Sequence, residues 1–222
     1  MLTLLTPSGG RVTAMCRGCR RPKSPLLPAS ELFATGEYLL VLKQDRAILT
    51  SCQVHDSFYP IRLDYDKLVY GSFFCALAEI IAQPGEPCAA LFHLLLEALS
   101  HLAYHETAPE ALAAAFILHC ARLMGYMPQL RHCVICGKTV SASELVYFCC
   151  ENGGVVCTRC YPHTPDAAAL TTGQLSWLIA GQSGELTSYL RLPHSDAPFA
   201  LMLGYIRVKT EKTFHQFAFP GN

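Results

Sequence analysis

The spacing of hydrophobic and polar residues changes along the chain and separates a strand-rich head from a helical remainder. Residues 11–18 alternate apolar and polar side chains, which is the two-residue period of a half-buried strand. The apolar run 2–6 precedes them across the turn-forming sequence Pro-Ser-Gly-Gly, so these two runs predict a β-hairpin. Residues 37–42 and 47–54 predict two further strands. The head is therefore expected to form a small sheet.

Beyond Asp66 the pattern becomes helical. Three long segments rich in Ala and Leu are apolar around most of their circumference, so they predict helices buried against one another, at 68–82, 88–104 and 109–125. Thr107 is the expected cap of the third helix, with Pro109 in its first turn. Three shorter helices are predicted at 171–180, 185–191 and 197–208.

The composition is that of a globular protein with a substantial core. Of the 222 residues, 51% are hydrophobic and only 15% are charged, which argues against a disordered chain. The longest apolar stretch, 88–104, is interrupted by His93, Glu97 and His101, a pattern that a membrane span does not favour. No basic segment precedes the short apolar run at the N-terminus, so we expect no signal peptide and a cytoplasmic protein.

The net charge of zero hides a basic head. Five bases occur before the first acid, Glu31, and they are Arg11, Arg17, Arg20, Arg21 and Lys23. Residues 68–130, in contrast, contain one base and five acids. A run of bases in a loop beside a small sheet favours a nucleic-acid surface, and the alternative is a solvated loop with no ligand.

Two pairs of cysteines form the most specific motif of the sequence. Cys133 and Cys136, and then Cys157 and Cys160, are each separated by two residues, with twenty residues between the pairs. This spacing is typical of a tetrahedral Zn²⁺ site, because each pair presents two thiolates from one tight loop. Four thiolates leave no open coordination position, so one structural zinc ion per chain is predicted.

Other cysteines offer alternatives to this assignment. Cys149 and Cys150 precede the second pair and are candidates to replace one ligand. Cys16 and Cys19 have the same two-residue spacing, but no second pair lies near them, which favours a core or loop role over a metal role. Buried or redox-active thiols are the alternative for the four-cysteine motif itself.

No catalytic motif is present in the sequence. None of the nine histidines is followed two residues later by Glu, and neither cysteine pair follows a proline, so the zinc deaminase pattern is absent. The phosphate-binding loop, the GxSxG elbow and the GxGxxG dinucleotide motif are also missing from the sequence. We therefore expect a protein that is not an enzyme.

Several segments together resemble one family. The runs TPSGGRVTAMCRGCRRPKSPL, DKLVYGSFFCALAEII, LGYMPQLRHCVICGK and VVCTRC occur in this order, and they are similar to the recombination and repair mediator family RecO. The resemblance implies an α+β protein with an OB-fold-like β-barrel at 1–66 and a mainly α-helical domain at 67–222. The zinc module is expected within that domain, at about 131–162.

The resemblance also implies a function and partners. Members of the family bind single- and double-stranded DNA, anneal complementary strands, and work with RecR to load RecA. They also engage the C-terminal tail of single-stranded DNA-binding protein. Carried onto this chain, the basic head becomes the DNA-binding edge, the four cysteines become zinc ligands, and localisation at the bacterial nucleoid is expected. Candidates to receive the tail carboxylate are Arg122, Arg131 and Arg207.

One departure from the family pattern concerns the barrel. The strand with which the family normally begins has no counterpart in this sequence, which leaves two alternatives: the chain begins late, or the barrel is incomplete and has an exposed edge. The alternative function is a zinc-stabilised helical adaptor that binds proteins and has no direct role on DNA.

Overall fold

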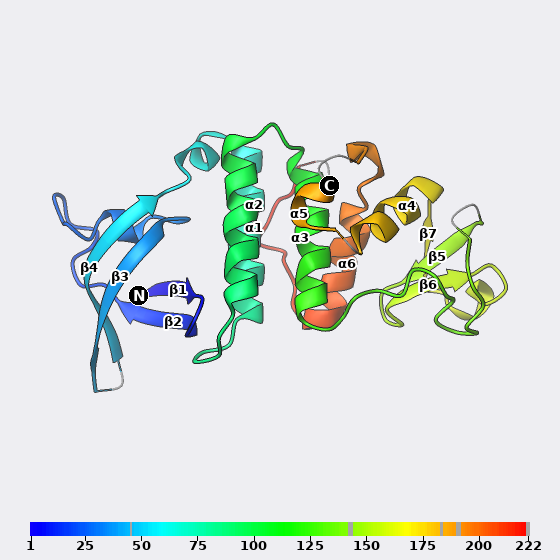
Figure 1. Cartoon of the computed structure of the whole chain (residues 1–222), viewed down its shortest axis with the longest axis horizontal. Coiled ribbons are helices and arrows are strands. Elements are labelled where there is room, and N and C mark those ends of the chain that lie inside the picture. The colour runs from blue at the N-terminus through cyan, green and yellow to red at the C-terminus, as the bar shows by residue number, and fades with distance from the viewer. Residues whose placement is uncertain (45, 142–143, 183, 190–191, 221–222) are drawn as a thin grey trace. The chain divides into compact units, whose positions relative to one another are not determined.

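The computed structural model describes residues 1–44, 46–141, 144–182, 184–189 and 192–220 (Figure 1). The chain divides into two compact units. Unit 1 comprises residues 1–106 together with 219–222, and unit 2 comprises 107–218. The predicted boundary between a DNA-binding domain at 1–66 and a helical domain at 67–222 stays a prediction.

The hairpin expected at the N-terminus is confirmed. Strand β1 (Leu2–Thr6) pairs antiparallel with β2 (Gly10–Met15). Gly10 has a positive φ of 63°, and a Cβ at this position would lie 2.0 Å from the Gln83 carbonyl oxygen. Only glycine allows this turn to approach the segment before the second helix so closely.

The other two predicted strands complete a mixed sheet. Strands β3 (Thr35–Lys43) and β4 (Arg46–Asp56) pair antiparallel, while Ala14 and Met15 of β2 pair in parallel with Ala47 and Ile48 of β4. The resulting order is β1-β2-β4-β3, so β1 and β3 are the two edges of the described sheet. The described strands show a four-stranded sheet, and the closed OB barrel stays a prediction.

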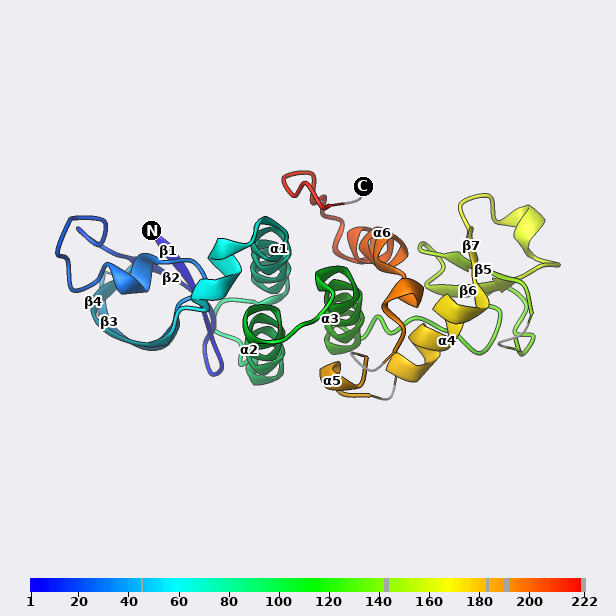
Figure 2. The ribbon, with the colours of Figure 1, turned by 90° about the horizontal axis from the view of Figure 1, so that it is seen from above.

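Two of the predicted helices pack with this sheet in unit 1. Helix α1 (Tyr65–Ile81) begins at the Asp64 side chain, which accepts a hydrogen bond from the Lys67 N–H at 3.0 Å. Helix α2 (Ala89–Tyr104) lies beside α1 in both views (Figures 1 and 2). Phe73 and Phe74 of α1 are completely buried, as the apolar pattern indicated.

Unit 2 is built around α3 (Pro109–Leu123), whose central residues are buried on nearly every side. The expected cap at Thr107 is wrong, because the N-cap residue is Ala108 and no side chain caps the helix. Pro109 does occupy the first turn, where its missing N–H costs nothing. Gly125 ends the helix with a positive φ of 78°, and the Tyr126 N–H donates to the Ala121 carbonyl oxygen at 2.7 Å, as in a Schellman motif.

The three shorter helices are also present. Helix α4 (Thr172–Gly181) begins with a capping box between Thr171 and Gln174. Helices α5 (Leu186–Tyr189) and α6 (Phe199–Thr210) follow, and both contact α3. Residues 190 and 191 of the predicted 185–191 helix lie outside the described residues.

Three short strands between α3 and α4 were not predicted from the sequence. Strands β5 (Val146–Cys149), β6 (Gly154–Cys157) and β7 (Ala168–Leu170) form an antiparallel sheet in the order β6-β5-β7. Strand β6 ends at Cys157, so this sheet positions part of the candidate metal centre.

Candidate metal centre and basic surface

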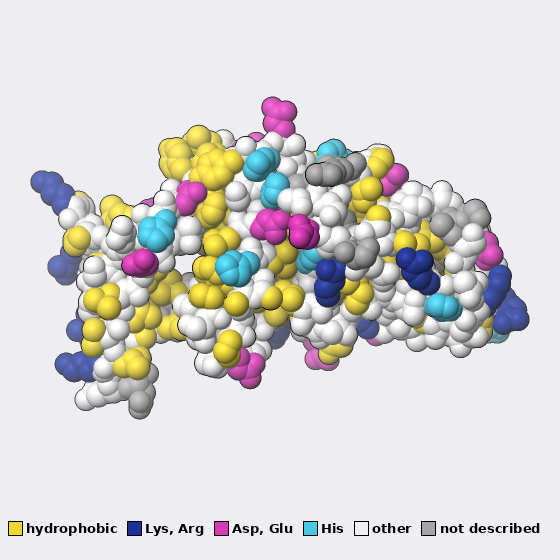
Figure 3. Space-filling view, in the orientation of Figure 1, with side chains coloured by type: hydrophobic (Ala, Val, Ile, Leu, Met, Phe, Trp, Pro, Cys, Tyr) yellow, Lys and Arg dark blue, Asp and Glu magenta, His cyan; other side chains and the backbone are white. Residues whose placement is uncertain are grey.

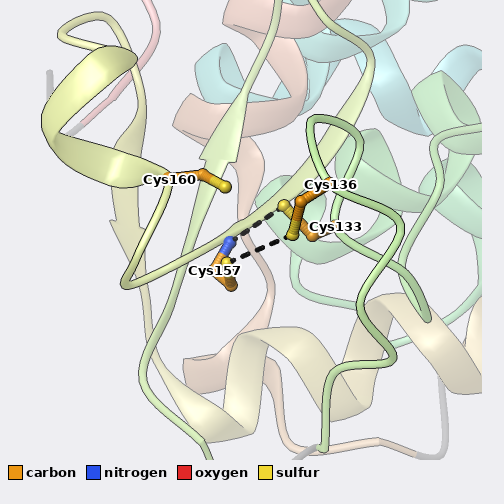
Figure 4. A group of neighbouring side chains, drawn as sticks. All are labelled: Cys133, Cys136, Cys157 and Cys160. Atoms are coloured by element: carbon orange, nitrogen blue, oxygen red, sulfur yellow. Dashed lines mark hydrogen bonds between the residues drawn. The ribbon is translucent and has the colours of Figure 1, made fainter.

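The four predicted ligand cysteines converge in unit 2. Cys133 and Cys136 lie on the loop that follows α3, while Cys157 ends β6 and Cys160 lies on the turn after it. The four sulfur atoms all lie within 4.8 Å of one another (Figure 4). Among the described residues, this is the group of cysteine, histidine and acidic side chains whose geometry suits a metal ion.

Backbone hydrogen bonds shape the first cysteine pair into a knuckle. The Gly137 N–H donates to the Cys133 carbonyl oxygen at 2.9 Å, and the Cys133 N–H donates to the Lys138 carbonyl oxygen at 2.8 Å. Gly137 has a positive φ of 73°, a conformation that side chains other than glycine rarely adopt. This explains why the sequence has glycine directly after the pair.

The second pair is joined to the first by the small sheet. The Val134 N–H donates to the Val155 carbonyl oxygen at 2.9 Å, and the Cys157 N–H donates to the Cys133 sulfur at 3.4 Å. The Cys160 N–H donates to the Cys157 carbonyl oxygen at 3.0 Å, which closes a second turn. Both pairs therefore present their sulfurs from hydrogen-bonded loops.

The spacing of the sulfurs fits a tetrahedral thiolate site. A metal–sulfur distance of about 2.3 Å in a regular tetrahedron places the sulfurs about 3.8 Å apart. The sulfurs of Cys136 and Cys157 are 3.8 Å apart. Cys133, Cys157 and Cys160 are buried and Cys136 is exposed, so the centre lies just below the surface.

The surroundings favour ionisation of the first pair. The Lys138 N–H, with help from the Arg159 side chain, lowers the pKa of the Cys136 thiol to about 6. Burial raises the pKa of Cys133, but the N–H groups of Cys157, Cys136 and Ile135 outweigh it and leave that pKa below its ordinary value. In contrast, burial and the neighbouring thiols raise the pKa of Cys160 to about 12, so this thiol loses its proton only when a cation compensates the charge.

The alternative ligands do not join this cluster. Cys149 is buried and its thiol donates to the Asn152 side-chain oxygen at 3.0 Å. Burial raises the pKa of Cys150 to about 11. Neither belongs to the described metal-binding group. Both behave as packing residues.

The basic loop is ordered by its own backbone and exposes four of the five predicted bases. Successive turns carry it, with the Arg21 N–H donating to the Gly18 carbonyl oxygen and the Ser24 N–H to the Arg21 carbonyl oxygen, both at 3.0 Å. Cys19 is buried and anchors the loop. The side chains that point into solvent belong to Arg17, Arg20, Arg21 and Lys23. Among the described ion pairs, none involves these four bases.

Arg11 differs from the other four bases. It is half-buried in β2, and its guanidinium donates to the Glu79 carbonyl oxygen at 3.3 Å. Its side chain is therefore already engaged with α1. A contact to DNA through Arg11 stays a prediction, and the geometry supports it less than it supports the loop.

Two bases that were not predicted as part of this surface extend it. Lys43 and Arg46 face each other across the β3–β4 hairpin, and both are exposed. Lys and Arg side chains gather at the sheet end of unit 1 in the space-filling view (Figure 3). The parallel pairing of β2 with β4 brings this hairpin beside the start of the basic loop. This pairing was not visible in the sequence, so the two bases were not predicted.

One of the three arginines considered for a tail carboxylate has another role. The Arg122 guanidinium donates to the carbonyl oxygens of Gly181, Gln182 and Gly184 at the end of α4. It therefore holds the C-terminal end of that helix in place. Arg131 is exposed and Arg207 is half-buried.

Comparison with known proteins assigns both parts of the chain. Residues 1–58 match the family model for the N-terminal part of recombination protein O, and residues 62–197 match the model for its C-terminal part. The chain belongs to the RecO family. The N-terminal match covers the four-stranded sheet, and the C-terminal match covers the four cysteines.

Individual relatives agree with this assignment. A protein from Bifidobacterium adolescentis named DNA repair protein RecO is 32% identical over 197 residues, covering 84% of this chain and 77% of the relative. The protein of the same name from Acetivibrio thermocellus is 28% identical, covering 85% and 76%. That from Syntrophus aciditrophicus is 28% identical, covering 96% of this chain and 86% of the relative.

Two further findings concern the names of the relatives and the helices of this chain. The RecO relatives are named for DNA repair and not for a catalysed reaction. Within the described part of the chain, every helix falls short of the length and apolar character that a membrane crossing requires.

Proposed function

We propose that this RecO-family protein binds DNA through its basic loop and anneals complementary strands without catalysing a reaction. The observation that carries the proposal is the exposure of Arg17, Arg20, Arg21 and Lys23 on one ordered loop, with no acid paired to them among the described ion pairs. Four cations held close together on a hydrogen-bonded loop attract phosphates. Lys43 and Arg46 extend the same path along the sheet.

Charge neutralisation supplies the mechanism of annealing. Two complementary strands repel each other through their phosphates, and a cationic surface that contacts both strands lowers this repulsion. Base stacking contributes less, since three of the five aromatic residues in 1–66 have little exposed ring: Phe33 and Phe58 are buried and Tyr38 is half-buried. Tyr59 is 57% exposed and Tyr65 is 65% exposed, so these two are the candidates for stacking.

The metal centre is proposed to be structural. The donor set, the 3.8 Å sulfur separation and the depressed pKa of Cys136 fit one Zn²⁺ ion held by Cys133, Cys136, Cys157 and Cys160. When bound, the ion would compensate the thiolate charge and join the loop after α3 to the small sheet. Four protein ligands fill a tetrahedral zinc site, so the proposed role is stabilisation of unit 2.

The partners are proposed from the family assignment. RecR, the C-terminal tail of single-stranded DNA-binding protein and, indirectly, RecA are the partners that a recombination mediator of this family requires. Exposed Arg131 is the candidate in this chain to receive the tail carboxylate. In this proposal, the protein acts where single-stranded DNA-binding protein covers DNA in a bacterial nucleoid.

Strand annealing of two complementary fluorescent oligonucleotides tests the proposal. A variant with Ala at Arg17, Arg20, Arg21 and Lys23 should anneal at least about tenfold more slowly, because about four phosphate contacts are lost. Lys212→Ala removes an exposed base from unit 2 and should leave the rate unchanged. Equal rates for the fourfold variant and the unaltered protein would reject the DNA role of the loop and favour the zinc-stabilised adaptor.

A further inference from the structure

Two histidines lie together at the C-terminal end of α2. His101 is in the last turn of the helix, and His105 is its C-cap residue, whose N–H donates to the His101 carbonyl oxygen at 3.1 Å. Residues four positions apart are neighbours on the surface of a helix. The centroids of the two rings are 4.5 Å apart, and the ring planes are tilted by 33°. The two imidazoles are therefore direct neighbours.

One ring nitrogen of this pair lacks a hydrogen bond. The Nδ1 atom of His101 is buried, and none of the described residues supplies a hydrogen-bond partner for it. A buried polar atom without a partner is costly, because it has lost its contact with water. His105 is exposed, so an ion from solvent can reach the pair. A metal ion bound by both rings would give the Nδ1 atom of His101 a partner.

The distance between the rings suits one metal ion held by both imidazoles. A ring nitrogen binds a transition metal at about 2.1 Å, which places the ring centroid about 3.2 Å from the ion. Two rings bound at a right angle then have centroids about 4.5 Å apart, whereas a tetrahedral angle separates them by about 5.2 Å. The observed 4.5 Å matches the right angle. Ni²⁺ and Cu²⁺ favour this angle, and imidazole is a suitable ligand for both.

The pair is separate from the cysteine centre and supplies two ligands. His101 and His105 belong to unit 1, whereas the four cysteines belong to unit 2. Within the described ranges, the cysteine group is the one in which three or more potential ligands lie close together. Water would therefore fill the other positions of an ion at the histidine pair. Such a site binds its ion more weakly than four thiolates do, and the ion exchanges.

We propose that His101 and His105 bind a divalent transition-metal ion that favours right-angled coordination, and that this ion fixes the last turn of α2. Protons compete with the ion for the ring nitrogens, so binding weakens as the pH falls. The N-terminal part of unit 1 ends at Glu106, so a bound ion stiffens the chain directly before it continues into unit 2. The basic loop has no part in this site, so the inference is independent of the DNA proposal.

Isothermal titration calorimetry with NiCl₂ tests the inference on the full-length protein, free of a polyhistidine tag and with its cysteines saturated with Zn²⁺. One Ni²⁺ ion per chain should bind at about pH 7.5. Binding should weaken at least about tenfold in His105→Ala, because one of the two protein ligands is lost. The matched control is His93→Ala, because His93 is an exposed histidine of the same helix outside the pair. It should bind nickel as the unaltered protein does.

Two further readouts locate the ion. Zinc measured by atomic absorption should stay bound during the titration, because nickel enters a different site. Nickel should also slow amide exchange at residues 101–106 of the unaltered protein, since the ion links side chains one turn apart. The inference would be overturned by an absence of nickel binding, by equal binding in His105→Ala and the unaltered protein, by release of zinc as nickel binds, or by slower exchange only elsewhere.

Discussion

At the scale of single residues, the local backbone decides which side chains are available for chemistry. The four cysteines of the candidate metal centre lie close together, as their spacing in the sequence predicted, and the Cys157 N–H donates to the Cys133 sulfur. The bases of the head were equally visible in the sequence, but their exposure was not. Arg11 and Arg17 belong to one basic run, yet Arg11 contacts the Glu79 carbonyl oxygen while Arg17 points into solvent. Tertiary contacts decide which bases of a run are exposed, and a count of charges in the sequence does not reveal this.

Replacing one ligand of the metal centre should remove the ion. Cys133→Ser is expected to lower bound zinc from about one ion per chain to near zero and to destabilise unit 2 by about 4 kcal/mol or more. Atomic absorption and thermal melting measure the two effects. Cys150→Ser is the control, because Cys150 lies outside the cluster, and it should retain the zinc. Full zinc occupancy in Cys133→Ser would contradict the assignment of this ligand.

A histidine in α3 should make the protein sensitive to acid. Burial, with a smaller effect of Arg122, lowers the pKa of His119 to about 4 from an ordinary value of 6.5. The unfolded chain therefore takes up the proton first as the pH falls, and stability is lost between about pH 6.5 and pH 4. The contribution approaches a slope of about 1.4 kcal/mol per pH unit.

Urea unfolding of the unaltered protein and of His119→Gln between pH 7 and pH 4.5 measures this contribution. The variant should lose less stability over this range, because Gln takes up no proton. Identical pH dependence of the two proteins would show that His119 does not titrate on unfolding.

At the scale of elements, segments with a clear apolar pattern or turn signal were predictable, whereas the three short strands of unit 2 were not. The three long helices and the four strands of unit 1 follow from apolar periods that extend over many residues. Strands β5, β6 and β7 have three or four residues each, which is too short for a period to show. The cap of α3 was predicted wrongly for a different reason. Pro109 is the first residue of that helix, so the cap position belongs to Ala108 and not to Thr107.

The capping box of α4 should contribute measurably to stability. The Thr171 hydroxyl accepts from the Gln174 N–H at 3.1 Å, and the Gln174 side chain accepts from the Thr171 N–H at 3.1 Å. Thr171→Ala should therefore lower the unfolding free energy by about 1 kcal/mol, as measured by urea denaturation. The adjacent Thr172→Ala removes an exposed side chain within the helix and should change stability by less than about 0.5 kcal/mol. Equal effects of the two substitutions would argue against the capping box.

At the scale of the whole molecule, the chain is two compact units with different stabilising chemistry. Unit 1 has an apolar core that includes Phe73, Phe74 and Ile61, whereas unit 2 adds the cysteine centre to the buried helix α3. The sequence predicted the sheet, the helices and the centre. It gave no sign of the parallel contact between β2 and β4, because that pairing joins residues more than thirty positions apart through backbone atoms alone.

Removal of the metal should act on the two units unequally. A strong chelator is expected to increase amide exchange throughout β5, β6 and the loop after α3, because folding of this region is coupled to the ion. Exchange in α1 should stay slow, since α1 belongs to the other compact unit. Hydrogen exchange followed by mass spectrometry measures both. Slow exchange around the cysteines after complete zinc removal would show that the centre does not stabilise unit 2.

The salt dependence of single-stranded DNA affinity tests the central claim, that the basic loop is the DNA-binding surface. Fluorescence anisotropy at a series of salt concentrations gives the slope of log affinity against log salt, which counts the phosphates that the protein neutralises. With Ala at Arg17, Arg20, Arg21 and Lys23, we predict weaker binding and a slope smaller by about 3, since each single-strand phosphate contact contributes about 0.7. An unchanged slope and affinity in this folded variant would contradict the account.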